Sequence, residues 1–425
     1  HSFPTACDAG TPMLLFYCWN HINMTDKLFA EVAGALEDPI LGVGQQYKAD
    51  PRAEKVNLSV GVYQTEEGKI PVLRAVREAE TRLYNAAAPH GYGQISGNPA
   101  LGAFVQELLF GKDSEVVRSR RACTVQSLGG TGAIKLAADL LHFVVGKTKA
   151  ATSVPTWGNH NAIFKQAGFD VSHYQYYNKA DGTIAFEQLL ADLRAKEAGT
   201  VVILHACCHN PTGLDFTADQ WKEVLQIVID RGLVPLLDIA YQGFDRGLEE
   251  DAFSIRLFAE SGISFLVSSS FSKSFSLYGE RVGGLTVVCQ NADEAARVLS
   301  QVKQMARANY SNPPNYGASL VATVAGDPVL RAQWEEELGE MRARIRSMRV
   351  ALKNAMDAEG SPRDFSFVTA QDGMFSFTGF TPEQVERLKK EYGIYAVANG
   401  RICIAGLNNH NVQYVAKAFT AVQKN

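Results

Sequence analysis

Lys273 and Arg281 are the side chains whose type and spacing most directly suggest chemistry. Lys273 ends a serine-rich segment that begins at Ser268, and Arg281 follows eight residues later. The apolar run from Ile263 to Val267 predicts a buried strand just before this segment. An ammonium group at the end of such a strand is unfavourable to desolvate unless it has a partner or a task. Short hydroxyl donors and a guanidinium suit a phosphate monoester beside an amine that becomes a nucleophile.

An amine beside a phosphate clamp indicates pyridoxal phosphate, a cofactor that forms a Schiff base with a lysine. Asp238 supports this hypothesis, because it interrupts the predicted strand Leu233–Ile239, where an ionised carboxylate is unfavourable unless paired. A protonated pyridine nitrogen is one such partner, and its charge makes the ring an electron sink. Tyr241 could donate to the ring's 3′ oxygen. The plainer interpretation of these two residues is a turn aspartate followed by a packed tyrosine.

Two turns extend the predicted site. Asn210 begins the sequence Asn-Pro-Thr-Gly after the predicted strand Val201–Ala206. Its amide would face the crevice where open α/β sheets bind ligands and could donate to the cofactor's 3′ oxygen. A glycine-rich stretch from Ser127 to Ala133 opens a helical run, so free N–H groups would meet a phosphate. Binding of a dinucleotide or of ATP fits less well, because neither Gly-x-Gly-x-x-Gly nor Gly-x-x-x-x-Gly-Lys-Ser/Thr is present.

These residues belong to a region, about 122–288, where short apolar runs alternate with amphipathic ones. The alternation predicts an α/β fold with a largely parallel sheet covered by helices on both faces. The predicted strands are Val201–Ala206, Leu233–Ile239, Ile263–Val267 and Val282–Val288, with helices Thr217–Arg231 and Ser254–Glu260 between them. A stripe of apolar residues from Leu330 to Met356 predicts a long helix of about 26 or more residues that packs on a core.

Charge and cysteine content indicate which kinds of binding partner the sequence favours. The 425 residues carry 41 basic and 45 acidic side chains, a net charge near −4, which gives no general attraction to nucleic acid or to an anionic membrane. The seven cysteines are too few and too scattered for a disulfide framework or a zinc site, so buried free thiols in a reducing compartment are expected. Small-molecule substrates, no metal and a cytoplasmic location follow as expectations.

Taken together, Asn210-Pro-Thr-Gly, Asp238-x-x-Tyr241, Ser270-x-Ser272-Lys273 and Arg281 resemble, in this order, the class I aminotransferases of fold type I. The similarity is closest to bacterial aspartate and aromatic-amino-acid aminotransferases and runs from about Met24 to the C-terminus. The resemblance implies a large domain built on a mostly parallel, seven-stranded type of sheet, with a smaller α/β domain made from both termini. It also implies pyridoxal 5′-phosphate as cofactor and a homodimer that shares its active sites.

The resemblance assigns a role to each matching residue. Lys273 would bind the cofactor and carry the proton between the substrate Cα and the cofactor, while Asp238 would pair with the pyridine nitrogen. His160 and His205 would support Asp238, and Trp157 would stack on the ring. The phosphate would be held by Gly130, Thr131, Ser270, Ser272 and Arg281, together with Tyr92 of the neighbouring subunit.

Two arginines would address the substrate. Arg401, with Gly61 and Asn210 beside it, would bind the α-carboxylate, and Arg307 from across the dimer would bind a side-chain carboxylate. A planar, bidentate grip explains why arginine is used. A surface ion pair is the plainer interpretation for each.

The substrate side chain is less clearly defined by the sequence. The segments 272–284 and 402–408 resemble the aromatic subgroup. Around the substrate pocket, Ile70 resembles the aromatic subgroup, whereas Val62, Thr131 and Asn312 resemble the aspartate subgroup and Gln64 and Gly91 fit neither. An enzyme that keeps Arg307 must still bind a dicarboxylate, so the resemblance predicts dual specificity for tyrosine or phenylalanine and aspartate, with 2-oxoglutarate as acceptor. An aspartate-restricted enzyme is the alternative within the family. A lyase or a regulatory protein that binds the same cofactor is the alternative outside it, although a lyase need not keep a residue such as Arg307.

Four segments are expected along the chain. Residues 1–23 would be a leader or a non-native extension before a start near Met24, and 24–70 an N-terminal arm with part of the small domain. Residues 71–340 would form the large cofactor-binding domain, and 341–425 the rest of the small domain.

Overall fold

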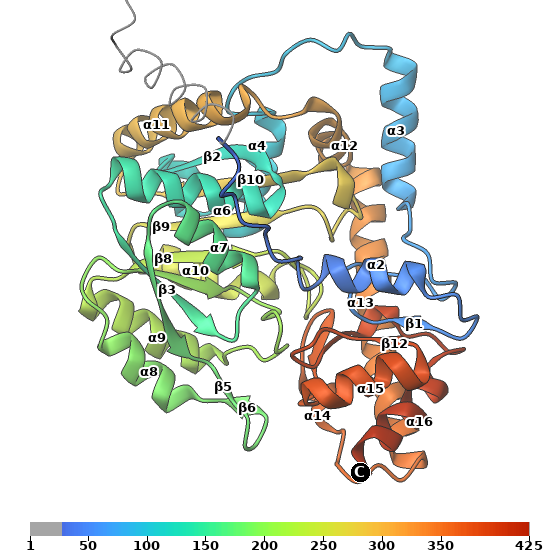
Figure 1. Ribbon diagram of the computed structural model, residues 1–425. Helices are drawn as coiled ribbons and strands as arrows, with labels where there is room; N and C mark the ends of the chain where they lie inside the picture. Colours follow the sequence, from blue (N-terminus) through green and yellow to red (C-terminus); the bar gives the residue numbers. More distant parts are fainter. Residues whose placement is uncertain (1–27, 425) are drawn as a thin grey trace, which may run out of the picture.

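A seven-stranded sheet forms the centre of the protein in the computed structural model, which describes residues 28–424 (Figure 1). The strand order is β2-β10-β9-β8-β7-β3-β4; β10 is antiparallel to both of its neighbours and the other pairs are parallel. The strands are β2 (Ala122–Leu128), β3 (Lys149–Val154), β4 (Asp170–Gln175), β7 (Val201–His205), β8 (Val234–Ile239), β9 (Phe265–Ser270) and β10 (Val282–Val288). The predicted α/β class is confirmed.

Helices cover both faces of this sheet, because side chains on its strands alternate between two apolar cores. Ile203 and Leu236 pack in one core, and Leu204 and Leu237 pack in the other. The covering elements are α4 (Pro99–Phe110), α5 (Glu115–Ser119), α6 (Gly129–Asp139) with a π-helical turn (Leu140–Val144), α7 (Gly158–Gln166), α8 (Phe186–Arg194), α9 (Ala218–Arg231), α10 (Phe253–Glu260), α11 (Ala292–Tyr310) and α12 (Asn315–Gly326). A short hairpin, β5 (Tyr177–Asn178) and β6 (Thr183–Ile184), projects beside them.

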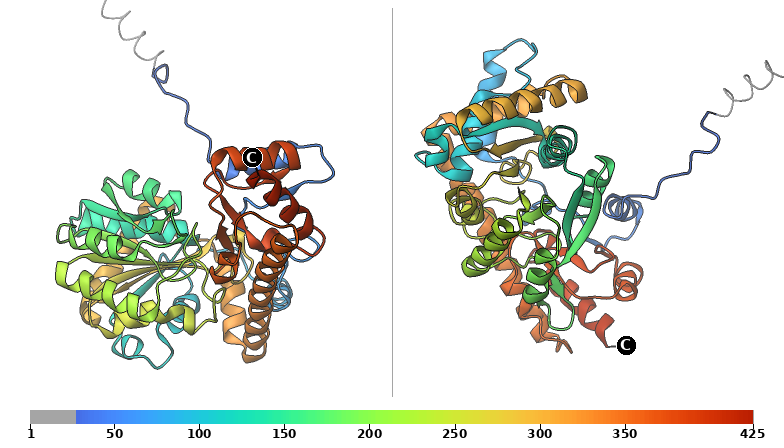
Figure 2. Two further views of the ribbon diagram at one scale, coloured as in Figure 1. Left: turned by 90° about the horizontal axis from the view of Figure 1, so that it is seen from below. Right: turned by 90° about the vertical axis from the view of Figure 1, so that its left-hand side faces the viewer.

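The C-terminal elements form a second layer beside the sheet and include the N-terminal part of the chain (Figure 2). Val56 and Asn57 of β1 pair in parallel with Ile394 and Tyr395 of β12. The elements are α2 (Leu41–Ala49), β1 (Val56–Asn57), α14 (Phe367–Ala370), β11 (Phe375–Phe377), α15 (Pro382–Tyr392), β12 (Ile394–Tyr395), β13 (Arg401–Cys403) and α16 (Val412–Gln423). Helix α3 (Arg74–Ala86) packs instead against α12 and α13, next to the sheet layer (Figure 1).

Helix α13 (Pro328–Ala358) runs from the sheet layer into the C-terminal elements. Asp327 caps its N-terminus and Pro328 occupies its first turn, two features that favour a helix start. The stripe from Leu330 to Met356 is buried, which confirms the predicted core-packing helix. The predicted domain boundary at residue 340 falls inside this helix.

Three smaller predictions can be compared with the fold. Helix α9 begins behind Thr217, which forms a capping box with Gln220, close to the predicted start. Strand β9 starts later than predicted and continues to Ser270, so Ser268, Ser269 and Ser270 belong to the strand and Ser272 follows it. The five described cysteines are free and buried, as expected.

Two further observations concern the ends and the surface of the chain. The expected leader, residues 1–23, and the start near Met24 lie outside the described residues. No helix among residues 28–424 is long and apolar enough to cross a membrane.

Candidate active site

One cavity of about 300 Å³ gathers most of the predicted site residues at the carboxyl ends of β7, β8 and β9. Parallel strands end at the same edge of a sheet, so the residues that follow them converge there. The predicted residues that line this cavity are Gly61, Gly130, Thr131, Trp157, His205, Asn210, Asp238, Tyr241, Ser270, Ser272, Lys273, Arg281 and Arg401.

Asp238 lines the cavity and is held by two donors. His160 Nε2 lies 2.8 Å from Asp238 Oδ2, and Ser268 Oγ donates to Asp238 Oδ1 at 2.7 Å. Burial alone would raise the pKa of this carboxyl, but the hydrogen bond and charge of His160, followed by His205 and Ser268, leave its pKa below the ordinary value. Asp238 is therefore an anion aimed at the cavity.

The histidines behind Asp238 form a hydrogen-bonded chain. Thr156 Oγ1 lies 2.9 Å from Nδ1 of His160 and 3.1 Å from Nε2 of His205. Burial, followed by the neighbouring His209 and His160, lowers the pKa of His205 well below its usual value. His205 is therefore neutral at physiological pH and acts as a hydrogen-bonding support for the ring of His160.

Lys273 follows β9 and points its ammonium over the ring of Tyr241, with Nζ 4.9 Å from the ring centroid. Burial lowers the pKa of Lys273 to about 8, and the charges of Arg281 and Arg401 add to this while Asp238 opposes it. About a tenth of this amine is therefore uncharged at pH 7 and about half at pH 8, far more than in an ordinary lysine, and the uncharged form is the one that a nucleophile or proton carrier requires.

The other end of the cavity fits a phosphate group. The N-terminus of α6 opens there without a side-chain cap, and Gly130, Thr131, Ser270, Ser272 and Arg281 surround it. Gly129 has φ +67°, and a Cβ at this position would lie 2.5 Å from Arg281 Nη2. Glycine is thus required for the backbone turn and for the approach of the guanidinium. This donor set suits pyridoxal phosphate: hydroxyls and a cation for its phosphate, an amine, and a carboxylate for its ring nitrogen.

Arg401 reaches the cavity from β13 and is nearly fully buried. Its Nη1 donates to Asn210 Oδ1 at 3.1 Å, its Nη2 donates to the carbonyl of Ser59 at 2.6 Å, and its guanidinium lies 4.1 Å from the ring centroid of Phe375. Its Nε is buried and has no hydrogen-bond partner among the described residues. A buried cation with spare donor capacity suits a carboxylate ligand.

Three predicted residues do not line the cavity. His160 lies directly behind Asp238, as its supporting role requires. Tyr92 is 95% exposed, and Arg307 on α11 is exposed and hydrogen-bonds with Ser311 of its own helix end. Both were predicted to act on the neighbouring subunit, so their distance from this chain's own cavity agrees with that prediction without testing it.

Sequence reasoning missed three contributors. Ser268 has no predicted role beyond its place at the start of the serine-rich segment, whereas its hydroxyl donates to Asp238. Thr156 links the two histidines, and Phe375 lies against Arg401. The signal for Ser268 was the alternation of side chains along a strand, and it was lost because the strand was ended at Val267.

Comparison with known proteins agrees with this geometry. The family described as "Aminotransferase class I and II" matches residues 53–419. The chain is 55% identical over 396 residues to an aspartate aminotransferase of Pseudomonas aeruginosa, covering 93% of this chain and 100% of that protein. It is 50% identical over 398 residues to an aromatic-amino-acid aminotransferase of Escherichia coli, with the same coverage. The chain belongs to the class I and II aminotransferases.

A solved structure extends the likeness to the cofactor. The aromatic-amino-acid aminotransferase from Burkholderia pseudomallei, covalently bound to pyridoxal phosphate, superposes with a TM-score of 0.92 at 54% identity. The match covers 93% of this chain and 100% of that one. The protein is thus a pyridoxal-phosphate-dependent aminotransferase of fold type I, as its sequence indicated.

Proposed function

We propose that this aminotransferase transfers the amino group of tyrosine, phenylalanine and aspartate to 2-oxoglutarate in two half-reactions. The names of its relatives support both substrate classes. The observation that carries the proposal is Arg401, a buried cation that lines the same cavity as Lys273 and whose Nε has no partner among residues 28–424. This pair suits a substrate with an α-carboxylate at one end and an amine at the reacting end.

Each residue of the cavity has a proposed task in this reaction. When bound, pyridoxal phosphate supplies an electron sink for the negative charge that develops at the substrate Cα. Arg401 and Asn210 would hold the carboxylate, and Lys273 would move a proton to and from Cα. Trp157 would stack on the cofactor ring, and Tyr241 would donate to its 3′ oxygen. Asp238, charged in this fold, favours a proton on the ring nitrogen.

Substrate choice is tested by steady-state kinetics with phenylalanine and aspartate as donors. Comparable kcat/KM values for the two donors are expected, and aromatic turnover lower by orders of magnitude would favour the aspartate-restricted alternative.

Arg307→Leu should lower kcat/KM for aspartate about 10²-fold or more while sparing phenylalanine, because only aspartate has a second carboxylate. Arg297→Leu, at another exposed position of α11, is the matched control.

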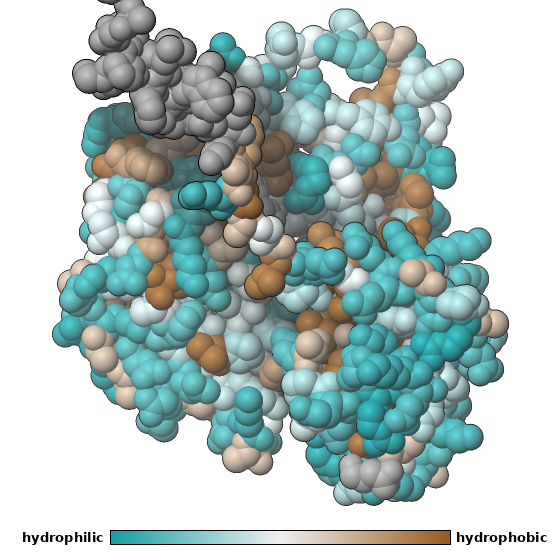
Figure 3. All heavy atoms as spheres, viewed as in Figure 1, coloured by the Kyte–Doolittle hydropathy of each residue, from teal (hydrophilic) through white to brown (hydrophobic). Residues whose placement is uncertain are grey.

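We also propose a homodimer in which Tyr92 and Arg307 serve the partner's cavity. Exposed apolar side chains such as Leu36 (99%) and Tyr84 (85%) support an interface, and Figure 3 shows hydrophobic side chains gathered between the sheet body and the C-terminal elements. Mixing Lys273→Ala and Arg307→Leu chains should restore aspartate activity, because one hybrid site then has both residues. No restoration after verified subunit exchange would place Arg307 in its own chain's site.

Two further proposals concern the domain division and the cellular compartment. Pairing of β1 with β12 supports a small domain made from residues 24–70 and 341–425, around a large domain of 71–340. The five buried free thiols suit a reducing compartment such as the cytoplasm.

A further inference from the structure

Ser268 and Asp238 are partners across two parallel strands. They stand opposite each other in the register of β8 and β9, so their side chains leave the sheet on the same face. The distance between Ser268 Oγ and Asp238 Oδ1 is 2.7 Å, within the range of a charge-assisted O–H···O bond. Ser268 is fully buried and is absent from the cavity lining, so it does not touch what the cavity holds.

Each oxygen of Asp238 thus has its own hydrogen-bond donor. His160 approaches Oδ2 and Ser268 approaches Oδ1, which fixes the plane of the carboxylate. Both donors stabilise the anion over the protonated acid. Burial raises the pKa of Asp238, and Ser268 is one of the groups that bring it back below the ordinary value.

We infer that Ser268 is a positioning residue for the amino-transfer reaction: its hydroxyl orients Asp238 and keeps it ionised, so that the proton they share stays on the cofactor's ring nitrogen. The inference deepens the proposed function and rests on the role proposed there for Asp238. Without the hydroxyl, Asp238 becomes a stronger base and the shared proton moves toward the carboxylate. The electron sink is then weaker, although every residue that touches the cofactor is unchanged.

Ser269 offers a matched control on the same strand. Its side chain leaves the opposite face of β9, and its Oγ is buried without a hydrogen-bond partner among the described residues. Ser269→Ala and Ser268→Ala each remove one buried oxygen, but only the second removes a bond to Asp238. A purely structural effect of losing a buried hydroxyl should therefore appear in both variants.

The test uses holoenzyme reconstituted with cofactor labelled with ¹⁵N in the ring. In Ser268→Ala, the ¹⁵N chemical shift should move toward the neutral pyridine value, and the Kd for pyridoxal phosphate should rise about tenfold, as expected when a hydrogen bond to a charged group is lost. Ser269→Ala should leave the shift unchanged and the Kd within about twofold. An unchanged shift in Ser268→Ala, or equal shifts in both serine variants, would overturn the inference.

Asp238→Asn separates this inference from the proposed function on which it rests. This variant should move the ring nitrogen fully to its neutral shift. If it does not, the proposed role of Asp238 itself is wrong. If it does and Ser268→Ala has no effect, only the role of Ser268 is wrong.

Discussion

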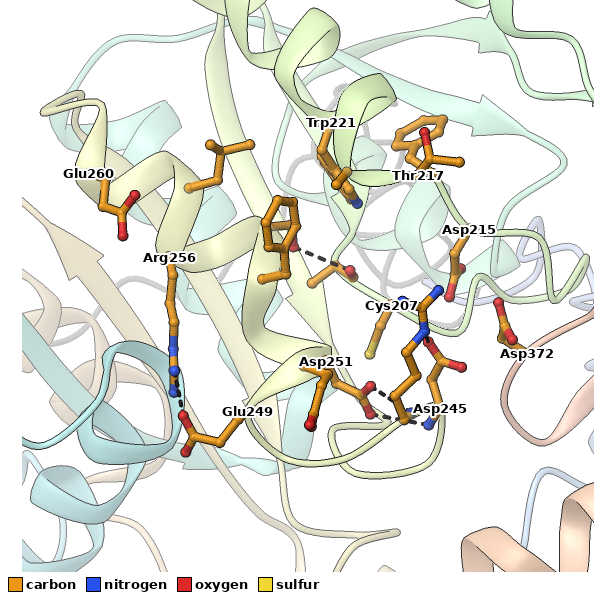
Figure 4. A pocket seen from close by; sticks show the side chains of 18 residues that line it. Cys207, Asp215, Thr217, Trp221, Asp245, Glu249, Asp251, Arg256, Glu260 and Asp372 are labelled. Atoms are coloured by element: carbon orange, nitrogen blue, oxygen red, sulfur yellow. Dashed lines mark hydrogen bonds and ion pairs between the residues drawn. The ribbon is translucent and has the colours of Figure 1, made fainter.

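Two cavities lie beside the same loop, and their buried carboxylates behave in opposite ways. Cys207 lines both: the catalytic cavity of about 300 Å³ and a larger one of about 500 Å³ on its other side. Figure 4 shows the larger cavity, where Asp215, Asp245 and Asp372 point toward one another. One carboxylate oxygen from each residue lies within 4.8 Å of those of the other two. We call these three residues the acidic cluster.

The difference lies in the neighbours of each carboxylate. Burial followed by the adjacent Asp372 raises the pKa of Asp245 to about 7, and burial also raises the pKa of Asp215 to about 6. Asp238 is equally enclosed, yet its donors keep its pKa below the ordinary value. Burial alone therefore does not decide the charge of a carboxylate; the groups that face it do. The smaller cavity, not the larger one, contains the reactive groups Lys273, Asp238 and Arg401.

The largest expected contrast between the cavities is in activity. Asp238→Asn should lower kcat about 10²- to 10³-fold, the equivalent of about 3–4 kcal/mol, because it breaks a buried charge pair. Asp245→Asn should leave kcat within about twofold, because the acidic cluster lies outside the catalytic cavity. Steady-state kinetics with saturating cofactor measures both. A comparable loss in the two variants would remove the distinction between the cavities.

The second expected effect is on the protonation of Lys273, the cation in the same cavity as Asp238. With a pKa of about 8, Lys273 in the apoenzyme has about a hundredfold more free amine at pH 8 than a lysine with the ordinary value of 10.5. Competitive acetylation with acetic anhydride, read by mass spectrometry against the exposed Lys222, should give a midpoint near pH 8 for Lys273. A midpoint near 10.5 would show that burial in this cavity does not destabilise the ammonium.

The smallest effect is on stability and concerns the acidic cluster. The pKa of Asp245 is about 7 in the folded state and about 3.9 when unfolded. The folded state binds more protons between these values, so its stability falls as the pH rises from about 4 to 7. Asp245→Asn should therefore stabilise the protein at pH 8, by on the order of 1–2 kcal/mol, and progressively less toward pH 4.

Urea unfolding of the holoenzyme at pH 5 and pH 8 measures this difference. Asp230→Asn, at an exposed position of α9, controls for the loss of one surface charge. A gain for Asp245→Asn that is the same at both pH values would contradict a titrating acidic cluster.

Much of the catalytic cavity could be predicted because the polar residues follow strands. Asp238 interrupts an apolar run, and Asn210 and Lys273 follow such runs, so a parallel sheet must bring them to one edge. Ser268 could not be assigned in this way, because its direction depends on where β9 ends and on its register with β8.

The acidic cluster was not predictable from the sequence for a related reason. Asp215, Asp245 and Asp372 lie on three separate loops, and no periodicity links them. Their approach depends on the contact between the C-terminal elements and the sheet, where the Asp372 amide donates to the Gly213 carbonyl at 2.6 Å. Gly213, with φ +67°, allows this close contact.

The claim that the cavity around Lys273, Asp238 and Arg401 carries out amino transfer is tested most directly by a single half-reaction. Holoenzyme is mixed with excess phenylalanine or aspartate and no 2-oxo acid, and the cofactor and product are identified by absorbance and mass spectrometry. We predict one pyridoxamine phosphate and one 2-oxo acid per chain, with no release of carbon dioxide or ammonia. A cofactor that remains in its aldehyde form, or a decarboxylated or deaminated product, would contradict it.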